Sequence, residues 1–180
     1  MVPTQTRPKH TFSVLIVDDE DAIRVALGRI LAADGYEVHA ASRGADALVL
    51  LDKMPIDLLL TDYNMPGMNG VDLAEKVLQV HPDVIRIILT VADDFAVVKE
   101  AINRAQIYRF LSKPWDASDL RLTVRSACEQ RRLERENAAQ QRVISRQQAL
   151  LDSLENQHPG ITSIKRDAGG AILLDDPDET

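Results

Sequence analysis

Short apolar runs alternate with amphipathic segments between residues 13 and 112. Five runs have the length and composition of buried parallel strands, namely 13–17, 37–41, 57–61, 84–90 and 108–112. The segments between them place apolar residues three and four positions apart, the spacing of an amphipathic helix, as in Ile23, Ala26, Leu27, Ile30 and Leu31. This alternation predicts a doubly wound α/β domain, in which helices cover both faces of a five-stranded parallel sheet.

A long segment without glycine or proline follows, from Asp116 to Gln157, and it is rich in strong helix formers. We expect one long helix whose first part packs on the domain. Seven later positions have heptad spacing, although three of them are polar: Leu133, Asn137, Gln140, Ile144, Gln147, Leu151 and Leu154. Two alternatives stay open, a dimeric coiled coil in which Asn137 fixes the register and a solitary solvated helix.

These patterns divide the chain into four parts. We expect a flexible N-terminus over residues 1–10, a folded domain over 11–128 and a helical extension over 129–157. Two short apolar runs about Ala168-Gly-Gly170 predict a β-hairpin within 158–180, which ends in an acidic tail.

Composition narrows the range of functions. The net charge of -7 is accompanied by no segment with a large positive excess, so direct nucleic-acid binding is not expected. No long apolar run indicates membrane insertion, and the single cysteine, Cys128, forms no internal disulfide. We therefore expect a cytoplasmic protein in which Cys128 is a packing residue.

Polar residues stand at the carboxyl ends of four apolar runs, the edge where open parallel sheets place their sites. Asp18 and Asp19 follow the first run, Asp62 the third and Lys113 the fifth, while Thr90 ends the fourth. Three carboxylates at one edge repel one another unless a cation lies between them, and oxygen ligands suit Mg²⁺. A lysine and a hydroxyl supply contacts for phosphoryl oxygens, so Asp62 is a candidate phosphoacceptor.

Four motifs together resemble the receiver domain of two-component response regulators. They are Val17-Asp-Asp-Glu20, Asp62-Tyr-Asn-Met-Pro-Gly-Met-Asn-Gly70, Leu89-Thr90 and Phe110-Leu-Ser-Lys-Pro114. The resemblance covers about residues 11 to 128. It implies a phosphorelay signalling protein that accepts its phosphoryl group from a histidine kinase or phosphotransfer protein.

The resemblance also implies a role for individual residues. Asp62 would be the phosphoacceptor, and Mg²⁺ would be bound by Asp19, Asp62 and the backbone carbonyl of Asn64, with Asp18 acting through water. Lys113 and Thr90 would hold the phosphoryl oxygens. Thr90 and Phe110 occupy the positions of the pair that changes conformation on phosphorylation.

Two further expectations come from a position that differs from the usual receiver sequence and from segments that are similar to particular groups of receivers. Val91 stands where receivers more often have alanine or glycine, and its bulk is expected to narrow access to Asp62. Residues 101–110 and 113–116 are similar to receivers that precede cyclic-di-GMP phosphodiesterase domains or transcriptional activator modules. The residues after 128 are too few for either module, so we expect output through an unidentified partner protein and a homodimer formed by the helical extension.

Two other functions remain as alternatives. One is a constitutive dimeric scaffold or phosphate sink, in which phosphorylation of Asp62 does not control the output. The other is a Mg²⁺-dependent phosphatase with an aspartyl nucleophile. Such enzymes usually carry a second aspartate two residues after the nucleophile, where this chain has Asn64. We expect no enzymatic activity beyond self-phosphorylation and self-dephosphorylation.

Overall fold

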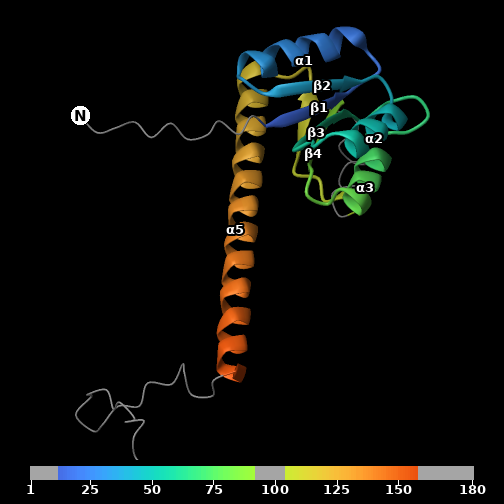
Figure 1. Ribbon diagram of the computed structural model, residues 1–180. Coiled ribbons are helices and arrows are strands. Elements are labelled where there is room, and N and C mark those ends of the chain that lie inside the picture. The colour runs from blue at the N-terminus through green and yellow to red at the C-terminus, as the bar shows by residue number, and fades with distance from the viewer. Residues whose placement is uncertain (1–11, 92–103, 158–180) are drawn as a thin grey trace, which may run out of the picture. The chain divides into compact units, whose positions relative to one another are not determined.

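The predicted five-stranded parallel sheet is confirmed in a computed structural model that describes residues 12–91 and 104–157 (Figure 1). The strands lie in the order β2-β1-β3-β4-β5, and each pairs in parallel with its neighbours. Their bounds are β1, Ser13–Val17; β2, Glu37–Ala41; β3, Leu58–Asp62; β4, Ile85–Val91; and β5, Arg109–Lys113.

The last three strands begin and end one residue later than the apolar runs predict. Asp57 stands outside β3, and its carboxylate accepts a hydrogen bond from the Ser13 amide at 3.0 Å. Val84 belongs to the turn before β4, because its amide donates to the His81 carbonyl. Backbone pairing, rather than hydrophobicity, sets these ends. As a result Asp62 and Lys113 are the last residues of their strands.

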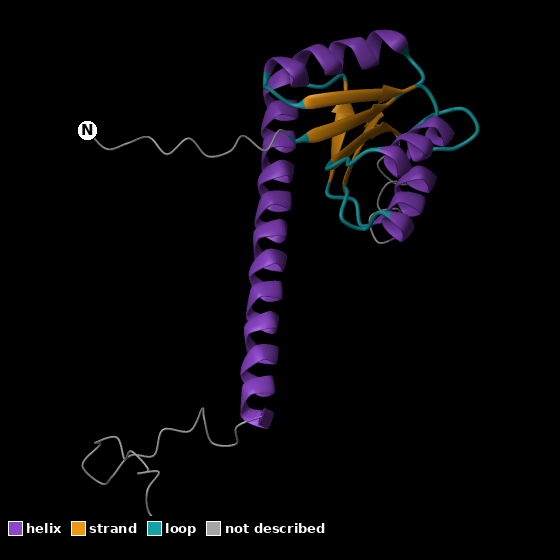
Figure 2. Ribbon diagram, viewed as in Figure 1, coloured by secondary structure: helices purple, strands orange, loops and turns teal. Residues whose placement is uncertain are grey.

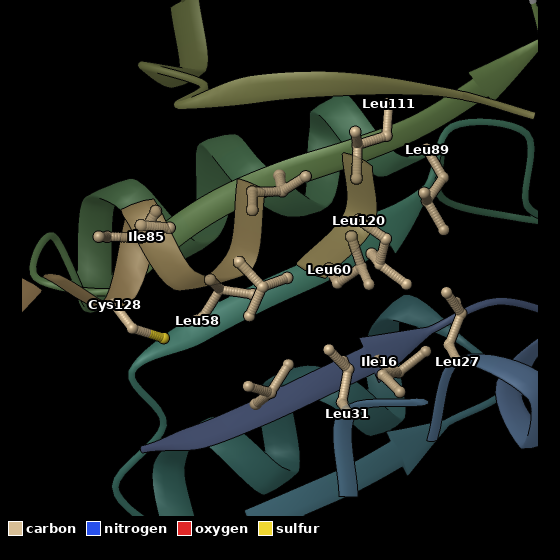
Figure 3. Close-up of a cluster of buried hydrophobic side chains, with 14 residues drawn as sticks. Ile16, Leu27, Leu31, Leu58, Leu60, Ile85, Leu89, Leu111, Leu120 and Cys128 are labelled. Carbon is tan, nitrogen blue, oxygen red and sulfur yellow. The ribbon is translucent and has the colours of Figure 1, made fainter. Parts of the chain in front are cut away.

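Two layers of helices cover the sheet (Figure 2). Helix α1, Asp21–Ala33, and the first turns of α5, Ala117–Gln157, pack on one face. Figure 3 shows this core, in which Leu27 and Leu120 meet the strand residues Ile16 and Leu60. Helices α2, Gly44–Lys53, and α3, Gly70–Val80, pack on the other face. The burial of both faces explains why β1, β3 and β4 read as mainly apolar runs, whereas the edge strands β2 and β5 are partly exposed.

The long helix is confirmed, although it begins at Ala117 rather than Asp116. The Asp116 carboxylate accepts hydrogen bonds from the amides of Ser118 at 2.8 Å and Asp119 at 3.1 Å, which is the role of a capping residue. The chain divides into two compact units, residues 1–132 and 133–180. In the first unit Arg131 of α5 forms an ion pair with Asp83 at 3.4 Å.

In the second unit the described residues are the helical segment 133–157. The predicted flexible N-terminus, 1–10, and the predicted hairpin and acidic tail, 158–180, lie outside the described residues. Within the described ranges no helix has both the length and the apolar character that a membrane span requires.

Cys128 is buried in the core cluster near Leu58 of β3 (Figure 3), and this burial predicts sensitivity to alkaline pH. Burial raises the pKa of the Cys128 thiol to about 12 and that of the Tyr36 hydroxyl, its hydrogen-bond partner, also to about 12. An acid whose pKa is raised by folding stabilises the protein below its unfolded pKa, and this contribution is lost as pH rises through the folded value. We expect the free energy of unfolding to fall between pH 9 and about 12.

Urea unfolding at a series of pH values measures this effect. Cys128→Ala and Tyr36→Phe should each flatten the alkaline decline, because each removes one of the two groups. The native thiol should also react slowly with a disulfide reagent until urea exposes it. Rapid modification of Cys128 in the native protein at neutral pH would contradict the buried placement.

Candidate functional site

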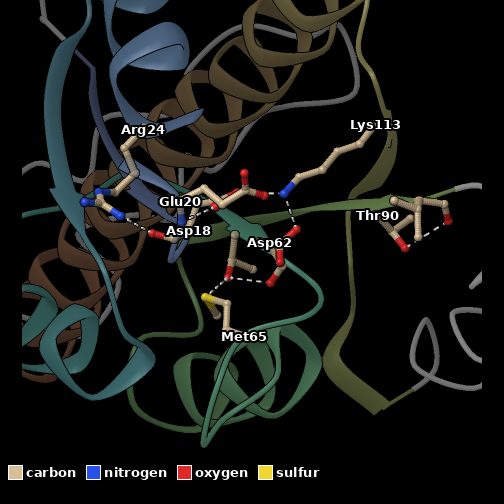
Figure 4. A network of polar contacts seen from close by, with 9 residues as sticks. Asp18, Glu20, Arg24, Asp62, Met65, Thr90 and Lys113 are labelled. Carbon is tan, nitrogen blue, oxygen red and sulfur yellow. Dashed lines mark hydrogen bonds and ion pairs between the residues drawn. The ribbon is translucent and has the colours of Figure 1, made fainter. Parts of the chain in front are cut away.

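Three charged side chains meet at the carboxyl edge of the sheet (Figure 4). The Lys113 ammonium lies 2.5 Å from Oδ1 of Asp62 and 2.8 Å from Oδ2 of Asp18. Asp62 ends β3 and is 5% exposed, while Asp18 follows β1 and is fully buried. Parallel pairing of β1 with β3, β3 with β4 and β4 with β5 brings these strand ends to one edge. The structure thus brings together Asp18, Asp62 and Lys113.

The turn between β1 and α1 is held by polar contacts on both sides of Asp18. The Asp18 carboxylate accepts a hydrogen bond from the Glu20 amide at 2.9 Å, and its backbone carbonyl accepts one from Arg24 at 2.6 Å. The sequence gives little indication that Arg24 bonds to the Asp18 carbonyl. The one signal is its position three residues after Asp21, which allows an ion pair on the helix. Asp19 is exposed on the same turn.

A cleft of about 700 Å³ adjoins this turn. Its wall consists of Asp19, the β2–α2 turn and the loop after β3, with these lining residues: Asp19, Ser42, Arg43, Gly44, Ala45, Pro66, Gly67 and Met68. Asp19 therefore faces a space that is open to solvent.

Burial and charge act in opposite directions on the two partners of the ion pair. Burial raises the pKa of Asp62 above its ordinary value, and the hydrogen bond and charge of Lys113 only partly offset this. Burial alone would lower the pKa of Lys113, but its contacts with Asp18 and Asp62 outweigh that effect, so its pKa is raised. A charged lysine beside a carboxylate of raised basicity is suited to nucleophilic attack on an anionic centre.

The sequence predicts a cation between the carboxylates, and in the structure the ammonium of Lys113 lies between two of them, Asp18 and Asp62. In residues 12–91 and 104–157, no three His, Cys, Asp or Glu side chains lie close enough together to hold a metal ion. The oxygen donors still fit Mg²⁺ chemically, since two buried carboxylates and the exposed Asp19 stand at one edge. Coordination would require Asp19 to approach Asp62.

The remaining site residues lie close to the strand ends but make contacts of their own. The Thr90 hydroxyl, in a residue that is 1% exposed, donates to the Val91 carbonyl at 3.3 Å (Figure 4). Phe110 is half-buried and packs with Tyr63 on the cluster that contains Ile88. Asn64 is exposed, and its backbone amide forms a hydrogen bond with the Asp62 carboxylate.

Gly70 shapes the loop that follows Asp62. A Cβ atom on Gly70 would collide with the backbone carbonyl oxygen of Asp62, and the Gly70 amide donates to the Tyr63 carbonyl at 2.9 Å. We expect Gly70→Ala to destabilise the protein by about 1–3 kcal/mol, because the backbone next to Asp62 must shift. Urea unfolding measures the change, and NMR shifts of residues 61–64 report the local distortion.

Gly28→Ala is the matched control for that substitution. Gly28 lies inside α1, where the nearest atom to an added Cβ would be 3.9 Å away, an ordinary contact. Because alanine favours helix more than glycine, this variant should gain up to about 1 kcal/mol. Equal effects of the two substitutions would contradict the close approach of Gly70 to Asp62.

The chain matches a family model and several known proteins. The model described as the response regulator receiver domain matches residues 14–125. Sporulation initiation phosphotransferase F of Bacillus subtilis is 30% identical over 112 residues, which are 62% of this chain and 90% of that protein. The crystal structure of the signal receiver domain of an HD domain-containing protein from Pseudomonas fluorescens Pf-5 has a TM-score of 0.65 and 35% identity. The match covers 68% of this chain and 98% of the chain in that crystal structure.

Longer proteins are also similar. The hydrogenase transcriptional regulatory protein HoxA of Cupriavidus necator is 35% identical over 117 residues, which are 65% of this chain. The match covers only 24% of HoxA, so this chain spans about a quarter of that relative.

Proposed function

Because this chain belongs to the response regulator receiver domain family, a family of signalling modules in two-component systems, we propose that Asp62 is its phosphoacceptor. The donor is a phosphohistidine of a histidine kinase or phosphotransfer protein. The observation that carries the proposal is the position of Asp62, a buried carboxylate at the end of β3 whose oxygen lies 2.5 Å from Lys113.

The transfer needs a nucleophile whose negative charge is compensated. A carboxylate oxygen of Asp62 attacks phosphorus, the bond from phosphorus to the donor nitrogen breaks, and the imidazole keeps the electron pair. Lys113 moves from the Asp62 carboxylate to a phosphoryl oxygen while it keeps its contact with Asp18. The buried Asp18 thereby holds the ammonium at the site throughout the transfer.

Receiver domains generally use Mg²⁺, and the oxygen donors of this chain fit it. Asp19, Asp62 and the Asn64 carbonyl are the proposed direct ligands, and Asp18 contacts the ion through water. When bound, Mg²⁺ neutralises charge on the phosphoryl oxygens. Asp19 is exposed at the cleft, where its side chain would be accessible to the ion.

Thr90 and Phe110 are the residues that we propose respond to the phosphoryl group. Thr90 can exchange its 3.3 Å hydrogen bond to the Val91 carbonyl for one to a phosphoryl oxygen, because both acceptors are oxygens. Phe110 is half-buried on β5, the strand that pairs with β4, and lies two residues before Ser112, the pairing partner of Thr90. We propose that the two residues shift together and alter the surface around β4 and β5.

Beryllofluoride binding tests the phosphoacceptor assignment directly. With Mg²⁺ and beryllofluoride, the amides of residues 62–64, 90 and 113 should shift in NMR spectra of the full chain, and those of Asp62→Asn should not. A shift in both proteins would remove Asp62 from the site. The wild-type protein could bind beryllofluoride while the Asp62→Asn variant keeps full cellular output. That result would identify the protein as a scaffold or phosphate sink instead.

The helical segment 133–157 is the proposed dimerisation element. Its heptad face exposes large apolar side chains, with Ile144 45%, Leu151 52% and Leu154 36% exposed, which is unfavourable for a solitary helix in water. We propose that two copies pair through this face and that phosphorylation of Asp62 alters the pairing or the contact with an output protein.

Leu151→Asp should break this pairing. A charge in an apolar seam is expected to weaken dimerisation roughly 100-fold, about 2.7 kcal/mol, because it would be buried without a partner. Sedimentation equilibrium measures the change. Ser145→Asp, on the opposite side of the helix, adds the same charge and should leave the dimer unchanged. A monomeric wild-type protein at high concentration would sink the proposal.

A further inference from the structure

Arg24 is a charged residue that is largely withdrawn from solvent beside the site. Its side chain is 17% exposed, although α1 is a surface helix. One guanidinium nitrogen donates to the backbone carbonyl of Asp18 at 2.6 Å (Figure 4). The other contacts the Asp21 carboxylate at 2.9 Å. The short bond to Asp18 joins the second turn of α1 to the end of β1.

The contact with Asp21 alone does not explain this placement. Asp21 is 83% exposed, and an exposed pair three residues apart on a helix contributes about 0.2–0.5 kcal/mol. The Asp18 carbonyl lies instead on the turn that carries the acidic residues of the site. Helix α1 begins without a side-chain cap from Glu20, so the bond from Arg24 is a side-chain contact that the capping position does not supply.

Two of these contacts act on Asp18 from opposite sides. The Glu20 amide bonds to one carboxylate oxygen of Asp18, and Lys113 bonds to the other. These contacts orient the Asp18 side chain only while the backbone stays in place, and Arg24 fixes that backbone at the carbonyl. The exposed Asp19 is the next residue along the chain, so the same bond constrains the backbone from which its side chain extends.

We propose that Arg24 is a positioning residue for the acidic turn, which holds Asp18 on Lys113 and presents Asp19 to the metal ion. This inference rests on the proposed phosphoacceptor function. The expected change in Mg²⁺ affinity on removal of Arg24 has the opposite sign to a purely electrostatic effect. A positive charge near carboxylates weakens cation binding, so its removal alone would tighten Mg²⁺ binding. Loss of a positioning contact weakens it.

Magnesium titration of the full chain, followed by NMR, separates these effects. Residues that orient metal ligands change metal affinity by about 10–100-fold when substituted, so Arg24→Met should raise the dissociation constant for Mg²⁺ about tenfold. Arg24→Lys keeps the charge but cannot span both contacts, and it should also weaken binding. This second variant keeps the test valid if Arg24→Met does not fold.

Two control variants isolate the contact to Asp18. Arg29→Met removes an exposed positive charge from the same helix, and Asp21→Asn removes the exposed partner of Arg24. Both leave the bond to the Asp18 carbonyl in place, so each should change Mg²⁺ affinity by about twofold or less. Unchanged or tighter binding in both Arg24 variants would overturn the inference, as would equal weakening in Arg29→Met.

A second readout needs no metal. If Arg24 holds the turn, the Glu20 amide, which bonds to Asp18, should exchange its hydrogen about tenfold faster in Arg24→Met, while amides of β3 keep their wild-type rates. Unchanged exchange at Glu20 would also overturn the inference. A wild-type protein that binds no Mg²⁺, with faster exchange in the variant, would contradict the proposed function and leave Arg24 a purely structural contact.

Discussion

Asp62→Asn is expected to abolish phosphoryl incorporation and to raise the free energy of unfolding at neutral pH by about 1 kcal/mol. The first effect follows because an amide is a poor nucleophile toward phosphorus. The second follows because burial outweighs the attraction of Lys113 and leaves the pKa of Asp62 raised. The functional residue thus destabilises the fold that presents it.

The pH dependence gives the sign of this effect. A carboxyl group with a raised folded pKa binds its proton more tightly in the folded protein than in the unfolded chain. Its contribution to stability is therefore fully present below the unfolded pKa and is lost as pH rises through the folded pKa. Asparagine does not titrate, so the gain of Asp62→Asn over wild type should be larger at pH 7 than under acidic conditions.

Asp46→Asn is a suitable control for urea unfolding. Asp46 is exposed in the first turn of α2, where a negative charge favours the helix N-terminus, so its removal should cost up to about 1 kcal/mol. A loss of stability in Asp62→Asn at neutral pH would show that the ion pair with Lys113 outweighs the burial of Asp62.

Lys113→Met is expected to destabilise the metal-free protein by about 3–5 kcal/mol, because it leaves two buried carboxylates without their shared cation. Asp18 is fully buried and Asp62 is 5% exposed, so water screens neither well. The raised pKa of Lys113 makes its contribution fully present below the unfolded pKa of lysine, and therefore at neutral pH. Methionine keeps most of the apolar stem and removes the charge together with its hydrogen-bond donors.

Magnesium should partly reverse this loss. The ion supplies positive charge to the same carboxylates, so the increase in unfolding free energy on adding Mg²⁺ should be larger in Lys113→Met than in wild type. Lys76→Met, at an exposed position on α3, is the control and should respond as wild type does. An equal response to Mg²⁺ in Lys113→Met would contradict a shared site for the ammonium and the ion.

The sequence predicts the fold because both faces of the sheet are buried. The strands β1, β3 and β4 then read as mainly apolar runs, and the helices place apolar residues three and four positions apart. Only the ends of β3, β4 and β5 differ, by one residue. Backbone pairing continues through the polar residues Asp62 and Lys113, and it leaves Asp57 outside β3.

The contacts of the site were less accessible to sequence reasoning. The order of strand ends predicts that Asp18, Asp62 and Lys113 lie near one another. It does not give the direction of each side chain, which depends on burial and on competing partners. Hence the sequence does not show that one ammonium bridges two carboxylates, nor that Arg24 bonds to a backbone carbonyl.

The most direct test of the central claim is the intact mass of the full chain after incubation with Mg²⁺ and a small acyl phosphate donor. We predict the addition of one phosphoryl group that is lost on treatment with hydroxylamine, as expected of an acyl phosphate, and that is absent from Asp62→Asn. No addition to the wild-type protein, with this donor or with a phosphorylated histidine kinase, would contradict the account. An equal addition to Asp62→Asn would also contradict it.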